Sequence, residues 1–579
     1  MENFFKDNED ILFHLEHLDL DRIIRLKEEG FREADRYPHA PRDEQDARES
    51  YGLVLSIIGE ICGEFIAPAA PQVDEEGPTL ENNQVRLNPA TQKALDMFAQ
   101  ADLMGFGIPR QYGGLNMPTT ILSAAAEIIA RADASFLNFG LQQDIAETIN
   151  KFASEEQKQA VLPRLCSGEW GSSMVLTEPD AGSDLQAVNL KAVPGENGTW
   201  YLTGVKRFIT NGCGTIGLVL ARSEDQGAGS ARGARGLSFF LYERDDRMII
   251  RRLEHKLGIH GSPTCELQFN HAPAQLVGER QRGLTKYTMW LMNNARLGIA
   301  AQAVGIAEAA YREADRYAAK RVQFDVPVRT LPPVFEMLTE MKVAIEAGRT
   351  LLYETSRFVD LKEGLEDYSE KHPEEKGEII DEKKKYAKLA GFFTPMVKAY
   401  ATEMANKVAY DAIQIHGGTG YMREFNAERH YRDARITNIY EGTTQLQIVA
   451  AIGPVTSGIA RMILDEYDHA AYPQGPELLE KIRAARKLFD ETLDFVKAYK
   501  GHDQFLSYHS RRLVEMATDL IIGYLLLRDG AHSGRKLKVA SIFIAKMSSR
   551  IEANRNFILS EDGTLLKNYG EVIGTIGGA

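Results

Sequence analysis

Hydrophobic residues in the first third of the chain recur at three- and four-residue intervals, the spacing of one face of an α-helix. Ile58, Ile61 and Phe65 are an example. Two stretches rich in Gly and Pro, residues 67–78 and 105–114, interrupt this pattern and are predicted to be linkers. We therefore expect an α-helical domain in this part of the chain.

After Trp170 the pattern changes to short apolar runs separated by Gly, Asn and Asp. Runs such as 237–242 and 265–269 have the length and the aliphatic or aromatic content of strands. Pro194-Gly195 and Asn197-Gly198 supply the turn residues of a hairpin between two of these runs. This region is predicted to form a compact antiparallel β-domain.

Helical periodicity returns at Gly283 and continues to the Gly453-Pro454 boundary, after which further amphipathic helices follow. Within it, the charged stretch 361–385 contains Pro373 and Gly377 and is predicted to be a solvated insertion between helices. The pattern as a whole predicts an α+β fold of five parts: an N-terminal extension (1–45), an N-terminal α-helical domain (46–171), a central antiparallel β-domain (172–281), a second α-helical domain of bundle type (282–453) and a C-terminal helical domain (454–579).

Composition narrows the class of protein. Of the 579 residues, 44% are apolar and 26% charged, and no stretch approaches the ~20 uncharged apolar residues that cross a bilayer, so no integral membrane segment is expected. The first ten residues are acidic and polar, unlike a signal or transit peptide, which predicts a cytoplasmic location.

The net charge of −14 repels phosphates, so the chain is not expected to bind nucleic acid. The four cysteines lie tens of residues apart, which predicts reduced thiols and no metal site.

Common catalytic signatures are missing, since the sequence has no G-x-G-x-x-G after a strand, no P-loop, no H-E-x-x-H and no G-x-S-x-G. The segment Leu176–Asp184, of sequence LTEPDAGSD, stands at the junction of helical and β patterns. Its small and polar residues could present N–H groups and hydroxyls to a flat polar ligand or a phosphate. Taken alone, it could equally be an ordinary loop.

Further segments change this interpretation. In order and approximate spacing, they match the acyl-CoA dehydrogenase family, which the chain resembles over roughly residues 53–454. The N-terminal and C-terminal additions resemble the longer branch of that family, which includes 3-methylmercaptopropionyl-CoA dehydrogenases. The matching segments are LTEPDAGSD (176–184), GVKRFITNG (204–212), RVQF (321–324), QIHGGTG (414–420), RD (432–433) and IYEGTTQ (439–445).

The resemblance implies an FAD-dependent flavoprotein of fatty acid metabolism that converts an acyl-CoA thioester to the trans-2-enoyl-CoA. A base must take the α-proton while flavin N5 accepts a hydride from Cβ, and donors must hold the thioester oxygen. Glu441 matches the family's base, and its N–H, with a flavin ribityl hydroxyl, is implied to bind that oxygen. The alternative interpretation of Glu441 is a carboxylate at a helix start. Another branch places its base directly before an arginine, but here Ala295 precedes Arg296 and cannot take a proton.

The same resemblance places Thr177, Phe208 and Thr210 beside the isoalloxazine ring. Phe208 stands where tryptophan is common, and a core position is its alternative. Arg321 and Phe324 are implied to contact the FAD of a neighbouring subunit, although Arg321 could also be a surface cation. The other implied cofactor-binding residues are Ser183, Gln414, Gly418, Thr443 and Gln445.

Ser183 is also implied to lie near the substrate's pantetheine arm and Arg296 near its CoA arm, and a structural ion pair is the alternative for Arg296. Tyr440 and Gly442 are further implied substrate-binding residues. We expect the acyl pocket to be built from parts of residues 134–149 and the helix around Trp290. The implied partners are an acyl-CoA substrate, electron-transfer flavoprotein and a second copy of the chain in a homodimer.

Two other functions stay open. An acyl-CoA oxidase or nitroalkane oxidase would share the motifs. A DNA-binding flavoprotein of the same fold would need a basic C-terminal surface, but residues 455–579 carry 17 Lys and Arg against 16 Asp and Glu.

Overall fold

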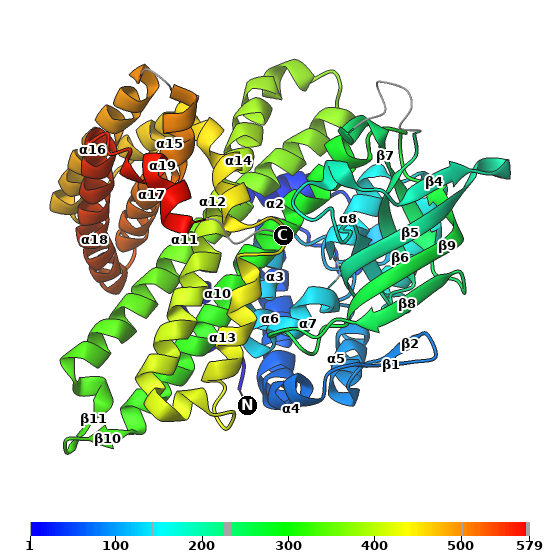
Figure 1. Cartoon of the computed structure of the whole chain (residues 1–579), viewed down its shortest axis with the longest axis horizontal. Helices are drawn as coiled ribbons and strands as arrows, with labels where there is room; N and C mark the ends of the chain where they lie inside the picture. Colours follow the sequence, from blue (N-terminus) through cyan, green and yellow to red (C-terminus); the bar gives the residue numbers. More distant parts are fainter. Residues whose placement is uncertain (1, 142, 225–232, 500–501, 575–579) are drawn as a thin grey trace. The chain divides into compact units, whose positions relative to one another are not determined.

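The computed structural model describes residues 2–141, 143–224, 233–499 and 502–574. The chain forms two compact units, one of residues 1–390 and 397–444, the other of residues 391–396 and 445–579. Figure 1 colours the elements along the sequence.

The first unit begins with short and medium helices, as predicted. Polar side chains set several of their starts: Asn8 accepts hydrogen bonds from the N–H groups of Asp10 and Ile11, and Ser154 and Gln157 form a reciprocal capping box. The helices are α1 (Glu9–His17), α2 (Asp21–Lys27), α3 (Glu44–Ile61), α4 (Ala67–Glu76), α5 (Pro89–Gln100), α6 (Thr119–Ala132), α7 (Ala134–Gly140), α8 (Gln143–Phe152) and α9 (Glu155–Cys166), with a small hairpin of β1 (Thr79–Glu81) and β2 (Gln84–Arg86).

The predicted linker over residues 67–78 is wrong, because most of it is helix α4. A π-helical turn, η2 (Cys62–Ile66), joins α3 to α4, and it changes the backbone hydrogen-bond pattern directly before Pro68, which has no N–H to donate. The continuous stretch Glu44–Glu76 is long and apolar enough to cross a membrane by length and composition. Helices of a protein core pass the same test, so this is weak evidence, and the absence of a membrane segment stays a prediction.

The β-domain contains strands whose pairings form a closed path from β6 through β4, β5, β9 and β7 back to β6. Most pairs are antiparallel, including the predicted hairpin of β4 and β5, but β3–β6 and the single β4–β6 pair are parallel. Large side chains such as Trp200, Phe240 and Phe269 fill one core of this domain. The strands are β3 (Ser172–Val175), β4 (Lys191–Pro194), β5 (Thr199–Thr210), β6 (Ile216–Arg222), β7 (Leu237–Glu243), β8 (Met248–Leu253) and β9 (Thr264–Leu276).

The second helical region of this unit packs long helices against α6. The backbones of α6 and α10 approach so closely that a Cβ on Gly305 would lie 2.4 Å from the carbonyl oxygen of Glu127. The elements are the π-helical turn η7 (Gly283–Thr288), α10 (Met289–Lys320), the hairpin β10 (Val322–Gln323) and β11 (Val326–Pro327), α11 (Pro332–Lys371), α12 (Lys376–His416), η9 (Gly417–Tyr421) and α13 (Ala427–Thr437).

The predicted insertion over residues 361–385 is also wrong. Helix α11 continues to Lys371 and α12 begins at Lys376, so that only the turn around Pro373 is non-helical. The Lys and Glu residues that suggested a solvated loop are good helix formers, and they cover the exposed sides of these two helices.

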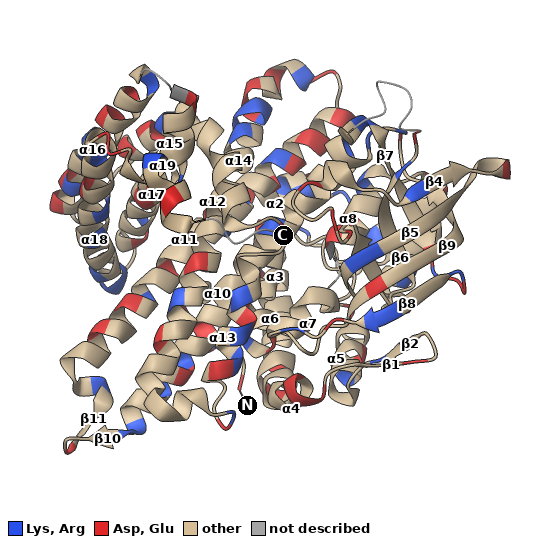
Figure 2. Ribbon diagram, in the orientation of Figure 1, with Lys and Arg blue, Asp and Glu red and all other residues tan. Residues whose placement is uncertain are grey.

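The second unit is helical, and α17 packs against both α16 and α18 around buried residues such as Phe489, Leu520 and Ile544. Both basic and acidic residues occur along these helices (Figure 2). For example, Arg550 pairs with Asp519 at 2.7 Å. The helices are α14 (Thr444–Thr456), α15 (Ile459–Asp468), α16 (Pro476–Ala498), α17 (His502–Gly530), α18 (Gly534–Leu559) and α19 (Thr564–Ile573).

Candidate active site

A cavity of about 240 Å³ lies in the first unit, between the helices and the β-domain. Leu137, Leu141 and Ile145 come from the region predicted to form the acyl pocket. Met292 and Ile299 come from α10, two and nine residues beyond Trp290. The other walls include residues of α6, of β3 and the segment after it, of the end of β5 and of the turn after α13.

Glu441 lies in this turn and lines the cavity. Its φ of 53° is in the left-handed region, which non-glycine residues adopt at a cost, and Gly442 follows with a φ of 88°. Lys398 Nζ donates to the carbonyl oxygens of Tyr440 at 2.9 Å and Gly442 at 2.6 Å, and Arg296 Nε donates to that of Glu441 at 3.4 Å. Two cations thus hold three consecutive carbonyls and fix the direction of the Glu441 side chain.

The surroundings of Glu441 suit a general base. Burial raises the pKa of its carboxyl group, while the charges of Lys398 and Arg296 act in the opposite direction. Burial also lowers the pKa of Lys398 to about 8. A carboxylate whose pKa is moved toward working pH is a stronger base than an exposed one, and the nearby cations keep a useful fraction ionised.

The facing wall comes from the β-domain. The register of β5 against β9 shifts between Lys206 and Ile209, and in this bulge Phe208 takes a φ of 61° and leaves 52% of its surface exposed. Phe208 is therefore not a core residue. Thr177 and Thr210 also line the cavity, and neither hydroxyl makes a hydrogen bond with the described part of the chain.

These residues fit a flat aromatic cofactor. The exposed ring of Phe208 offers an aromatic surface, and the two hydroxyls offer donors and acceptors for a polar ring edge. Met174, whose position was not assigned from the sequence, lines the same wall.

A buried lysine holds this wall in place. Lys206 Nζ donates to the carbonyl oxygen of Leu176 at 2.7 Å and pairs with Glu178 at 2.9 Å. The Glu178 carboxylate also accepts hydrogen bonds from the N–H groups of Asn189 and Leu190, at 2.7 and 2.9 Å. Sequence reasoning identified neither Lys206 nor Lys398, because a single lysine in a strand or helix has no recognisable signal.

Tyr440 belongs to a polar group at the same cavity. Its hydroxyl donates to Gln302 Oε1 and lies 3.4 Å from Asn138 Oδ1, while Gln302 Nε2 donates to Asn138 Oδ1 at 2.8 Å. Asp144, in the first turn of α8, also lines the cavity.

The structure thus brings together Glu441, Tyr440, Gly442, Thr177, Phe208 and Thr210, with Arg296 against the Glu441 backbone. The remaining predicted site residues lie elsewhere in the described chain. Ser183 is exposed beside Gly182, which lines the cavity, and Thr443 is partly buried. Arg321, Phe324, Gln414, Gly418 and Gln445 are exposed, the last in the second unit.

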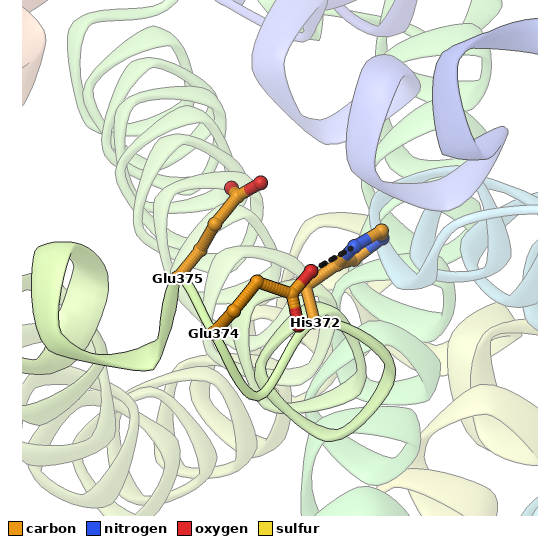
Figure 3. Close-up of side chains that lie close together, drawn as sticks. All are labelled: His372, Glu374 and Glu375. Carbon is orange, nitrogen blue, oxygen red and sulfur yellow. Dashed lines mark ion pairs between the residues drawn. The ribbon is translucent and has the colours of Figure 1, made fainter.

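A separate group of possible metal ligands lies in the turn between α11 and α12 (Figure 3). His372 Nδ1 pairs with Glu374 Oε1 at 3.5 Å, and Glu375 Oε2 accepts a hydrogen bond from the Tyr368 hydroxyl at 2.5 Å. These ordinary pairs at a solvent-exposed turn account for the cluster, and we assign no metal to it.

Comparisons with known proteins match nearly the whole chain. Family models match for the N-terminal domain (residues 54–169), the middle domain (173–272) and the C-terminal domain (282–451) of acyl-CoA dehydrogenases, and an additional model described as acyl-CoA dehydrogenase C terminal matches residues 456–562.

Comparisons with individual proteins point to the same family. The chain is 34% identical to 3-methylmercaptopropionyl-CoA dehydrogenase of Ruegeria pomeroyi over 78% of its own length and 80% of that protein. It is 32% identical to human mitochondrial short-chain specific acyl-CoA dehydrogenase, covering 70% and 90% of the two chains. The solved structure of butyryl-CoA dehydrogenase from Megasphaera elsdenii matches with a TM-score of 0.59 and 29% identity, covering 70% and 97%.

Proposed function

The chain belongs to the acyl-CoA dehydrogenase family of flavoprotein oxidoreductases acting on CH–CH bonds, and from this premise we propose that it is an FAD-dependent acyl-CoA dehydrogenase with Glu441 as its base. The observation that carries the proposal is the position of Glu441. Its carboxyl group lines a cavity whose facing wall presents Thr177, Phe208 and Thr210.

In the proposed reaction, an acyl-CoA thioester lies with its α- and β-carbons between these two walls. Glu441 removes the α-proton, and its raised pKa makes the carboxylate basic enough for this weakly acidic C–H. FAD, when bound against Thr177, Phe208 and Thr210, supplies the hydride acceptor for the β-carbon. The product is the trans-2-enoyl-CoA.

The chain's own residues prepare this step. Lys398 and Arg296 fix the Glu441 backbone and so aim the carboxylate, while the apolar walls exclude water from the reacting carbons. We propose, from the family resemblance, that the N–H of Glu441 holds the thioester oxygen and that Ser183, Tyr440 and Gly442 contact the substrate.

The remainder of the FAD site is proposed to form between two copies of the chain. Arg321 and Phe324 of one subunit would contact the cofactor of the other, and Gln414 and Gly418 would complete the pocket. Their exposure in a single chain leaves them available for this contact. Thr443 and Gln445 are further proposed cofactor residues. Electron-transfer flavoprotein in the cytoplasm is the proposed electron acceptor.

The Glu441→Gln variant tests the proposal. It should bind FAD normally but lose a rate factor of about 100 to 10,000, typical for removal of a general base. The measurement is anaerobic bleaching of the bound flavin by acyl-CoA in a stopped-flow spectrometer, with exposed Glu424→Gln as the control. Near-normal bleaching by Glu441→Gln would refute the assignment, and rapid reoxidation of the reduced enzyme by air would indicate an oxidase instead.

A further inference from the structure

A second carboxyl group, that of Asp144, lines the same cavity as Glu441. It makes no hydrogen bond or ion pair with any residue that the structure describes, although its backbone carbonyl accepts one from the Thr148 hydroxyl. The next acid on the same helix, Glu147, lies outside the cavity wall and accepts a hydrogen bond from Asn294 at 3.4 Å. Asp144 is therefore an unused polar group in a largely apolar wall.

A second unused group lies in the same cavity wall. The Oδ1 atom of Asn138 accepts from Gln302 Nε2 at 2.8 Å, which fixes the orientation of the amide. Its Nδ2 atom is buried and has no hydrogen-bond partner among the described residues. The cavity thus has one spare carboxyl group in its wall, and a lining residue, Asn138, carries a buried N–H donor without a partner among the described residues.

A wholly aliphatic acyl chain would leave both groups buried without partners, which is unfavourable. It would also exclude water from around the Asp144 and Glu441 carboxyl groups, whose charges repel each other. Burial and the charge of Glu441 already raise the pKa of Asp144 to about 7, so that Asp144 can either donate or accept a hydrogen bond near neutral pH. A hydroxyl group on the acyl chain would complement either form, and an ammonium group would complement the ionised form.

Resting on the proposed function, we propose that Asp144, assisted by Asn138, makes the acyl site selective for thioesters whose acyl group carries a hydrogen-bond-donating substituent, a hydroxyl or an amine. The hydroxyl would donate to the Asp144 carboxylate, while the apolar walls contact the methylenes and Asn138 adds a polar residue to the same wall.

The test uses the full-length holoenzyme and matched pairs of thioesters that differ only in a terminal hydroxyl: butanoyl- against 4-hydroxybutanoyl-CoA, pentanoyl- against 5-hydroxypentanoyl-CoA, and hexanoyl- against 6-hydroxyhexanoyl-CoA. Rates are read as anaerobic flavin bleaching. In at least one pair, the wild-type protein should favour the hydroxylated thioester in kcat/KM by ~10- to 100-fold, the value of one or two satisfied hydrogen bonds.

Variants of Asp144 test whether this residue causes the preference for the hydroxylated thioester. Asp144→Leu should remove or invert this preference, and the near-isosteric Asp144→Asn should keep the fold and reduce the preference. Glu147→Gln, one turn further along α8 and outside the cavity wall, is the matched control and should keep the wild-type preference.

Three results would count against the inference. A wild-type preference for the aliphatic member of every pair would overturn it while leaving the proposed function intact, because the flavin would still be bleached. A hydroxyl preference unchanged in both Asp144 variants would overturn the role of Asp144. Failure of every thioester to bleach bound flavin would overturn the proposed function and this inference with it.

Discussion

The direction of the Glu441 side chain depends on contacts to the backbone on either side of it. Lys398 donates to the carbonyls of Tyr440 and Gly442, and Arg296 donates to the carbonyl of Glu441 itself. These bonds hold a left-handed backbone that a glutamate would otherwise seldom adopt. Lys398 is therefore a positioning residue, and its positive charge also lowers the pKa of the Glu441 carboxyl group.

Replacing Lys398 by Met should lower kcat by ~10- to 100-fold, because the carboxylate loses its orientation. It should also raise the pKa of Glu441, since a nearby positive charge that favours the ionised form is removed. Because the base acts deprotonated, activity falls as pH drops through that pKa, and the acid limb of the pH–rate profile should move to higher pH. Lys388→Met, on the exposed side of α12, is the control, and an unshifted profile in Lys398→Met would contradict this role.

Some residues of this candidate site could be predicted from the sequence because they belong to continuous motifs. Glu441, Thr177, Phe208 and Thr210 stand in continuous motifs, and the structure places them around one cavity. Lys398 lies inside a long helix, and its two carbonyl partners come from a turn more than 40 residues away. Such a contact depends on tertiary packing and leaves no local pattern in the sequence.

At the scale of elements, the sequence predicted which regions are helical and which are strands but failed at local breaks. The strand that carries Phe208 was predicted, whereas its bulge was not, because a bulge depends on register against β9. Residues 67–76 and 361–371 have the Pro or charge content that is typical of loops, but both are helical. In the first a π-helical turn precedes Pro68, and in the second Lys and Glu are good helix formers. The domain boundaries stay predictions.

One buried ion cluster joins four helices of the first unit. Arg349 of α11 contacts Asp10 of α1, Glu127 of α6 at 2.9 Å and Glu308 of α10 at 2.9 Å, and all four side chains are buried. The N-terminal extension is therefore attached to the bundle through charge as well as through apolar packing.

The Arg349→Met variant should be destabilised by about 3–5 kcal/mol, because it removes the buried cation shared by Asp10, Glu127 and Glu308, of which Glu308 still pairs with Arg312 at 2.6 Å. Thermal and urea denaturation followed by circular dichroism measure the loss. Arg316→Met, which removes an exposed pair with Glu313, should change stability by less than about 0.5 kcal/mol. Equal stability of the two variants would show that the buried cluster contributes little to holding α1.

At the scale of the whole molecule, large apolar side chains stand exposed at one end of the bundle helices. Phe324, at the tip of the β10–β11 hairpin, is 85% exposed, and Tyr421 of η9 is 79% exposed. Single exposed apolar residues are common, but Phe324 lies three residues from Arg321, which is also exposed. This pair is what the proposed contact with a second subunit's cofactor requires.

If each active site combines Glu441 of one chain with Arg321 of the other, two inactive variants should complement each other. Glu441→Gln and Arg321→Glu are each expected to be nearly inactive, the first through its base and the second through weakened FAD binding. In a co-expressed mixed dimer, one of the two sites keeps both residues, so random mixing should restore about a quarter of wild-type activity. Activity of the mixture that stays at the level of the separate variants would show that Arg321 serves its own chain or no site. Analytical ultracentrifugation of the wild-type protein distinguishes this result from a failure to dimerise.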